Sequence, residues 1–177
     1  MKPKWWNKSR SYLIKKDKVI SKLIRSYKGH LTTRNNFFYS LTRSIISQQI
    51  SVAAADSVFS KFEKKCKNKI NPKTVKKLSI QDLKKCGLSK MKAIGIKSLA
   101  QKILDKSFNP KLISKMTDEE AINYLSSLRQ IGRWSAEMVL IFFYNRPNIW
   151  PVQDIGLLRA ISNNYKKKYL PPKSFVS

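Results

Sequence analysis

One stretch of the chain has the pattern of a helix end, a short turn and a new helix start. Helical periodicity runs to about Leu128 and resumes after Gly132, which predicts two helices joined by a tight turn. The first amides of the second helix have no partners within that helix, and with the helix dipole they form an anion site. Gly132 allows a positive φ or a close approach of a phosphate. The alternative is an ordinary corner between two helices, which is the commoner structure.

The second candidate for chemistry is the carboxylate of Asp154. Most of the other acids fall in first turns or on surface faces of predicted helices, where acids are common. Asp154 instead follows the apolar segment 149–152, predicted to be extended, and opens the last helix. A carboxylate fixed there beside a cleft can stabilise a developing positive charge. The alternative is that Asp154 only caps the helix. Glu137, one turn into the second hairpin helix, is the next candidate.

The charge of the chain indicates a polyanionic partner. Lys and Arg number 37 against 10 Asp and Glu, which gives a net charge of +27 and a pI of about 10.3. Each phosphate that Lys or Arg neutralises releases a condensed counterion, whatever the base sequence, so nucleic acid is the leading candidate. A genomic bias towards lysine and an acidic membrane surface are the two alternatives.

Composition excludes several other classes. Apolar residues make up 42% and aromatic residues 11% of the 177 residues, enough for the core of one domain and too many for a disordered basic tail. The longest apolar run, residues 138–144, is far shorter than the roughly 20 residues of a membrane span. No secretory signal is recognisable, so we expect a cytoplasmic protein. Two cysteines and one histidine argue against a disulfide scaffold or a Cys/His metal site.

The periodicity predicts an all-α fold. Helices are expected over residues 12–27, from 37 to a break near 48–51, and on through 62, and the hairpin pair covers 118–128 and 133–144. Shorter or later helices open at Pro72, Ser79, Ser89 and near Asp154. Ser79 with Asp82, and Thr117 with Glu120, have the spacing of capping boxes.

Several segments together resemble the helix-hairpin-helix DNA glycosylases. They are residues 128–136 (LRQIGRWSA) and 150–156 (WPVQDIG), with residues 36–38, 43–51 and 87–92 agreeing in order and spacing. The match covers about residues 10–160 and is most similar to the alkylation-repair branch, DNA-3-methyladenine glycosylase II. The resemblance implies a single domain over residues 1–177, with two packed helical subdomains, a cleft between them and a hairpin over 118–144. The resemblance also implies that the C-terminal part is either short or truncated.

The resemblance also implies an activity. It predicts base excision repair by a monofunctional hydrolase that flips alkylated purines of the 3-methyladenine type out of double-stranded DNA, with Asp154 as the catalytic carboxylate. Trp134 stands where members that also cut the strand carry a lysine. No metal is required for bond cleavage, and Cys66 and Cys86 cannot build a four-cysteine iron–sulfur cluster. We expect a monomer associated with the nucleoid.

The resemblance assigns the remaining site residues by position. Trp134, Trp150 and Met138 would line the base pocket. Gln49, or alternatively Ile50, would fill the gap left by the flipped base, and Gln130, Gly132, Arg133 and Ser135 would bind DNA backbone. The backbone carbonyls of Ser126, Leu128 and Ile131 would hold Na⁺ or K⁺.

Three residues depart from the family pattern. Gln130 replaces a hairpin glycine, so a positive φ there would be strained. Gln153 stands where many members have a second acid. Met138 replaces an aromatic residue, which would make the pocket less selective for cations.

Other interpretations stay open. Trp134 could pack in the core, and Gln48 and Gln49 could be buried amides that hold the break between two helices. The whole chain could be a non-catalytic helix-hairpin-helix DNA-binding module, or a glycosylase for mismatched or oxidised bases.

Overall fold

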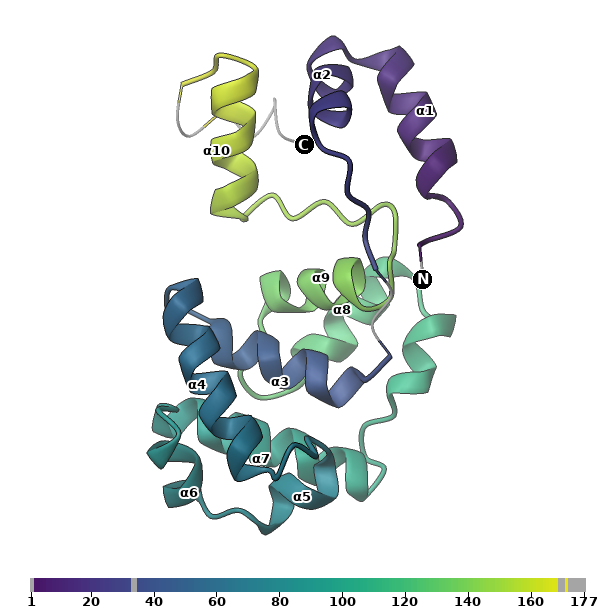
Figure 1. The fold of residues 1–177 in the computed structure, drawn as a ribbon. Helices are drawn as coiled ribbons and strands as arrows, with labels where there is room; N and C mark the ends of the chain where they lie inside the picture. Colours follow the sequence, from purple (N-terminus) through teal and green to yellow (C-terminus); the bar gives the residue numbers. More distant parts are fainter. Residues whose placement is uncertain (1, 33–34, 169–170, 172–177) are drawn as a thin grey trace. The chain divides into compact units, whose positions relative to one another are not determined.

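The computed structural model describes residues 2–32, 35–168 and 171, and every regular element in these ranges is a helix (Figure 1). The elements are α1 (Trp6–Lys16), α2 (Lys18–Ser26), α3 (Phe37–Ser47), α4 (Val52–Lys65), α5 (Pro72–Lys77), α6 (Ile80–Lys85), α7 (Lys90–Leu104), the 3₁₀ helix η1 (Pro110–Lys115), α8 (Asp118–Ser126), α9 (Arg133–Phe142) and α10 (Ile155–Asn164). The all-α prediction is confirmed. None of these helices is both long and apolar enough to cross a membrane.

The chain divides into two compact units. Unit 1 comprises Met1–Thr33 and Asn145–Ser177, and unit 2 comprises Arg34–Tyr144. The two units are described separately below.

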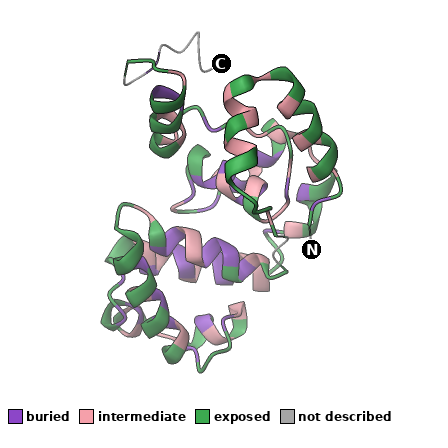
Figure 2. Ribbon diagram, turned by 45° about the horizontal axis from the view of Figure 1, so that its top comes forward, coloured by how far each residue is buried: buried purple, intermediate pink, exposed green. Residues whose placement is uncertain are grey.

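Unit 2 is built around α3. Leu41, Ile45 and Ile46 of this helix are completely buried, and α3 contacts α4, α7 and α9. Figure 2 shows buried residues on the inner helices of this unit and exposed residues on its outer side. The other helices contribute fully buried side chains to the same core: Phe62, Leu83, Ile96, Ile113, Leu125 and Leu140. Each such side chain contributes about 1.5–3 kcal/mol by leaving water, so apolar burial fixes the helices that carry the candidate site.

The predicted helix starts of unit 2 are confirmed by their caps. The Ser79 hydroxyl accepts the backbone N–H of Asp82 at 3.0 Å while the Asp82 carboxylate accepts that of Ser79 at 2.9 Å. Thr117 and Glu120 make the same reciprocal pair at the start of α8. These bonds satisfy amides that a helix start leaves unpaired, so short polar side chains placed the starts of α6 and α8 from local sequence alone.

Unit 1 corrects one prediction. Residues 12–27 form parts of two helices instead of one, because the chain turns at Asp17, where φ is −138°. The Asp17 carboxylate accepts the backbone N–H of Ile20 at 2.8 Å and the phenol O–H of Tyr165 at 2.8 Å. The Arg10 guanidinium donates to the Ile24 carbonyl oxygen at 2.9 Å and ties α1 to α2. Aspartate is a strong N-cap, and here its cap overrides a continuous apolar periodicity.

Candidate nucleic-acid interface and base pocket

The turn between α8 and α9 is closed by backbone bonds. Leu128 N–H donates to the Leu125 carbonyl, and Ile131 N–H donates to the Leu128 carbonyl, both at 3.1 Å. Gln130 lies between them with φ at 68°, so the strain expected from a side chain at this position is present. The positive φ considered for Gly132 is wrong: its φ is −90°. The left-handed residue of the turn comes two positions earlier, where the backbone must reverse.

Gly132 instead opens the start of α9. It is the N-cap of α9, and among the residues that the structure describes no side chain caps this end of the helix. A Cβ atom built at Gly132 would have nothing within 4 Å, so the space in front of the helix start is open. An uncapped, unobstructed helix N-terminus has the geometry to receive a phosphate oxygen.

Arg133 is held by two carboxylates. Its Nε donates to Glu137 Oε1 at 3.1 Å, and its two terminal nitrogens donate to the carboxylate of Glu119 on α8. Burial raises the pKa of Glu137, and the Arg133 charge opposes that rise. This network braces the hairpin, which sequence reasoning did not foresee because Glu119 looked like an ordinary first-turn acid.

Ser135 points inward. It is 4% exposed, and its hydroxyl oxygen accepts an N–H of the Gln48 side-chain amide at 3.0 Å. The same amide nitrogen donates to the Gln130 carbonyl oxygen at 2.8 Å. A phosphate contact at Ser135 would therefore have to use the backbone. Gln48 fits the alternative of an amide that holds the chain between two helices.

The segment between α3 and α4, residues 48–51, is here named the Gln loop. Gln49 is exposed with φ at 57°, and Ile50 is 40% exposed. The Ser51 hydroxyl caps α4 through the Ala54 N–H at 3.2 Å. Both residues predicted to enter DNA are thus presented to solvent.

A hollow of about 260 Å³ lies between α3 and α9. Trp134 and Met138, which are two of the three predicted pocket residues, line it one turn apart on α9, and Trp134 is 38% exposed. The rest of the lining is Ser40, Arg43, Ser44, Ser47, Val139, Phe142 and Phe143. The α3 wall was not predicted, although its positions repeat at helical spacing. Trp134 is therefore both partly exposed and a pocket wall, instead of a core residue.

Arg43 is the charged member of the lining. Its guanidinium pairs with Asp56 and lies over the Phe59 ring at 4.6 Å from the centroid. The carboxylate of Asp56 balances its charge, and the pair ties α3 to α4.

Asp154 lies in unit 1 at the N-cap of α10. Its Oδ1 accepts the backbone N–H of Leu157 at 2.7 Å, so it is the cap that the alternative interpretation described. The segment before it forms turns instead of the predicted extended strand, with Val152 N–H bonded to the Trp150 carbonyl at 3.0 Å and Asp154 N–H to Pro151 at 2.9 Å. Trp150 is 52% exposed in this turn region. The cap orients the carboxylate, and a capping role does not conflict with catalysis.

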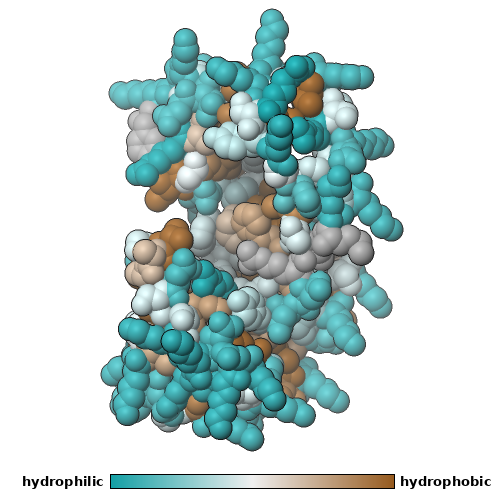
Figure 3. All heavy atoms as spheres, in the orientation of Figure 1, coloured by the Kyte–Doolittle hydropathy of each residue, from teal (hydrophilic) through white to brown (hydrophobic). Residues whose placement is uncertain are grey.

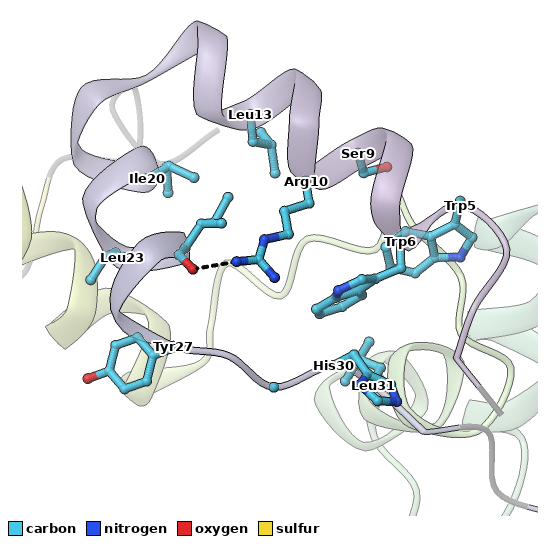
Figure 4. Close-up of a pocket in the computed structure, with 12 residues that line it drawn as sticks. Trp5, Trp6, Ser9, Arg10, Leu13, Ile20, Leu23, Tyr27, His30 and Leu31 are labelled. Atoms are coloured by element: carbon cyan, nitrogen blue, oxygen red, sulfur yellow. Dashed lines mark hydrogen bonds between the residues drawn. The ribbon is translucent and has the colours of Figure 1, made fainter.

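Unit 1 also holds a larger hollow, of about 430 Å³, that contains none of the predicted site residues (Figure 4). In Figure 4 the rings of Trp5, Trp6 and Tyr27 and the side chains of Leu13 and Leu23 surround it. Its exposed walls are mostly apolar, although Ser9, Arg10 and His30 are also among the lining residues.

Positive charge covers much of unit 2. Figure 3 shows hydrophilic side chains over the part that carries α4, α5 and α6. Exposed lysines of this part include Lys61, Lys64, Lys65, Lys84 and Lys85. Such a surface attracts phosphate backbone without reading base sequence.

Sequences similar to this chain include proteins named as DNA glycosylases. The chain is 27% identical over 163 residues to DNA-3-methyladenine glycosylase 1 of Schizosaccharomyces pombe, covering 90% of this chain and 72% of that protein. It is 34% identical over 124 residues to the alkylbase DNA glycosidase-like protein mag2 of the same yeast, covering 68% of this chain and 58% of that protein.

Solved structures with a similar fold also include DNA glycosylases. The fold matches S. pombe 3-methyladenine DNA glycosylase in complex with abasic DNA with a TM-score of 0.83 at 25% identity, covering 96% of this chain and 85% of that one. It matches a Bacillus halodurans DNA-3-methyladenine glycosidase with a TM-score of 0.75 at 26% identity, covering 86% and 71%. Residues 42–174 match the family model. The chain belongs to the HhH-GPD superfamily of base excision DNA repair proteins, as the sequence motifs predicted.

Proposed function

We propose that this protein is a monofunctional DNA glycosylase that hydrolyses the N-glycosidic bond of alkylated purines of the 3-methyladenine type. The observation that carries the proposal is the hollow between α3 and α9, lined by Trp134 and Met138. It adjoins both predicted DNA-binding elements along the chain, because Ser47 leads into the Gln loop and Trp134 follows the hairpin turn. The names of the two S. pombe relatives support the choice of alkylated bases.

The hollow suits one extruded base. Its volume of about 260 Å³ is smaller than the roughly 300–1,000 Å³ of pockets for larger ligands. An alkylated purine that carries positive charge would gain about 0.5–2 kcal/mol over the Trp134 ring. Flipping the nucleotide out of the duplex costs a few kcal/mol, and the cost is smallest for damaged base pairs. Gln49, or alternatively Ile50, would stabilise the flipped state by filling the space that the base leaves.

Asp154 would drive bond cleavage. As the bond between C1′ and the base nitrogen breaks, its electron pair leaves with the base and positive charge builds on the sugar. The carboxylate stabilises that charge or orients the attacking water, whose oxygen bonds to C1′ while its proton is released. Trp150, four residues before Asp154, would line the pocket from the same turn region.

The hairpin would grip the DNA backbone through the open start of α9. Gln130, Gly132 and Ser135 would contribute backbone contacts, and so would Arg133, because its guanidinium is already paired with Glu119 and Glu137. A lysine nucleophile is replaced by Trp134 at the corresponding position, so we propose base release without strand cleavage.

A monovalent cation would fit the hairpin at the carbonyls of Ser126, Leu128 and Ile131. Within the described residues the Ser126 hydroxyl is buried without a hydrogen-bond partner, and the Leu128 carbonyl already accepts the Ile131 N–H. A carbonyl oxygen has a second lone pair, so this segment retains the chemistry that Na⁺ or K⁺ prefers. The bound cation would supply positive charge beside a phosphate. We propose no metal for bond cleavage and no iron–sulfur cluster.

The test is release of free base from methylated DNA. We expect the wild-type protein to release 3-methyladenine, which chromatography detects. The DNA strand should stay intact until alkali is added to cleave the abasic sites. The variant Asp154→Asn should keep DNA binding and the helix cap but lose base release. Asp17→Asn is a matched control, because Asp17 caps α2 through the same type of bond. Unchanged base release by Asp154→Asn would remove Asp154 from the mechanism.

The net charge of +27 favours a second candidate, a DNA-binding module without catalysis. That module would bind undamaged duplex with a steep salt dependence and release no base. Release of oxidised or mismatched bases instead would keep the enzyme and change its lesion. We further propose that the protein acts as a monomer on damaged double-stranded DNA, in the cytoplasm at the nucleoid.

A further inference from the structure

The Gln loop and the hairpin turn are joined directly by one side chain. Gln48 donates from its amide nitrogen to the Gln130 carbonyl oxygen at 2.8 Å and to the Ser135 hydroxyl at 3.0 Å. Gln130 is in the turn and Ser135 is in the first turn of α9, so one amide bonds on both sides of the proposed phosphate site. Any shift of the loop relative to the hairpin would break these bonds.

Lys92 of α7 holds the other side of the loop. Its ammonium group donates to the Ile46 carbonyl oxygen at 2.9 Å and to the Gln48 carbonyl oxygen at 2.6 Å. These carbonyls end α3, where the helix dipole is negative, so a cation there is favourable. Partial burial of the ammonium group beside these carbonyls lowers the pKa of Lys92.

The same face of α7 receives the hairpin turn. Gly95 lies three residues after Lys92 and therefore on the same side of the helix. A Cβ atom at Gly95 would lie 2.7 Å from Gln130 Cγ, closer than real Cβ contacts come, and 3.3 Å from the Arg129 carbonyl oxygen, which is a tight contact. Glycine is unfavourable inside a helix, so its presence here has a physical reason in the close approach of the turn.

Gln49 shows what this support achieves. Its φ of 57° is unfavourable for a residue with a side chain, and such a conformation persists only where surrounding contacts fix it. Gln48 immediately before it is fixed through both its side chain and its carbonyl oxygen.

We propose that Lys92, Gln48 and Gly95 are positioning residues that hold the Gln loop in register with the hairpin turn. With this register fixed, Gln49 enters the duplex at the nucleotide whose phosphate the hairpin grips. The inference rests on the proposed function for the step in which Gln49 fills the gap. It adds α7 as the common support of two DNA-binding elements that lie far apart in sequence.

The test measures gap filling without catalysis. A duplex carries a tetrahydrofuran abasic analogue with 2-aminopurine opposite it, and the fluorescence change on binding reports insertion of Gln49. We expect Lys92→Met, Gln48→Leu and Gly95→Ala each to raise the protein concentration needed for the half-maximal fluorescence change about tenfold. This factor corresponds to about 1.4 kcal/mol. Lys90→Met, at an exposed position of the same helix, is the matched control for loss of one charge.

Two further measurements separate positioning from general stability. In a Gln49→Ala background, Lys92→Met should cause no additional loss, because the side chain it positions is gone. Lys92→Arg should restore the response, since a guanidinium can also donate to both carbonyls. Folding of each variant is checked by circular dichroism.

Each outcome decides between the alternatives. A folded Lys92→Met that responds like Lys90→Met overturns the inference. If Lys92→Met does not fold, Gln48→Leu decides in the same way, because it leaves the lysine in place. A wild-type protein without any response to the abasic duplex also overturns the inference. A wild-type response without release of methylated base overturns the proposed function alone.

Discussion

Replacing Arg133 with methionine tests how the start of α9 is held. The Arg133 guanidinium contacts Glu137 at 3.1 Å and also the carboxylate of Glu119. The Glu137 side chain is only 6% exposed, whereas that of Glu119 is 63% exposed. Methionine keeps much of the apolar stem and removes the charge, so the main loss is the cation beside a buried carboxylate.

The expected loss of stability is modest. A hydrogen bond to a charged group contributes about 1.5–3 kcal/mol, and solvent screening of the half-exposed Arg133 reduces this to about 1–2 kcal/mol at pH 7. For a chain of this length, 1 kcal/mol lowers the melting temperature by about 2–4 °C. We therefore expect Arg133→Met to melt about 2–8 °C below the wild-type protein.

The loss should depend on pH. Burial raises the pKa of Glu137 above its ordinary value of 4.5, and removing Arg133 raises that pKa further. Between the unfolded and folded pKa values the folded protein holds a proton that the unfolded chain has released, so stability falls as pH rises through this interval. The stability difference between Arg133→Met and the wild-type protein should be small at a pH near the pKa of Glu137 in the unfolded chain. It should reach its full size at a pH above the pKa of Glu137 in the folded variant.

Thermal unfolding followed by circular dichroism at pH 4, 6 and 8 measures this difference. Glu119→Gln is the control for the exposed contact and should have a small effect. The double variant Arg133→Met/Glu137→Gln should lose the added pH dependence. A melting deficit for Arg133→Met that is equal at pH 4 and pH 8, or a Glu119→Gln deficit as large as that of Arg133→Met, would refute the reasoning.

Two further predictions concern the cysteines and the surface charge. Burial raises the pKa of the Cys66 thiol to about 11 and also raises the pKa of the Cys86 thiol. Both thiols should therefore react with an aromatic disulfide reagent only when the protein unfolds. Rapid labelling of either thiol under native conditions would contradict this prediction. Raising the salt concentration should weaken binding to damaged and intact duplex by similar factors, because phosphate contacts carry no base information. A preference for damaged sites that disappears with added salt in a binding titration would contradict that expectation.

The helix starts of unit 2 could be predicted because their causes are local. The capping boxes at Ser79 and Thr117 and the cap at Ser89 are present where three- or four-residue patterns placed them. The break after α3 was predicted near residues 48–51 for the same reason. Asp17 was missed because the apolar periodicity on both sides of it is continuous, and only the competing cap divides it.

The candidate site divides in the same way. The family resemblance assigned Trp134 and Met138 to a base pocket, and in the structure both line the hollow of unit 2. The opposite wall on α3 could not be predicted, since it depends on how two helices distant in sequence pack together. The sequence left Gly132 and Gln130 open as the left-handed residue of the hairpin turn, and the structure has it at Gln130.

The sequence by itself determined the helical class, the helix starts, the excess of positive charge and the membership of a DNA repair superfamily. These properties depend on composition, on short-range hydrogen bonds and on motif spacing. Only the tertiary structure decided that Gln48 reaches Gln130 and Ser135, which are 82 and 87 residues away, and that Lys92 holds the end of α3. These hydrogen bonds form only after helices that are distant in sequence have packed against each other, so no local sequence pattern predicts them.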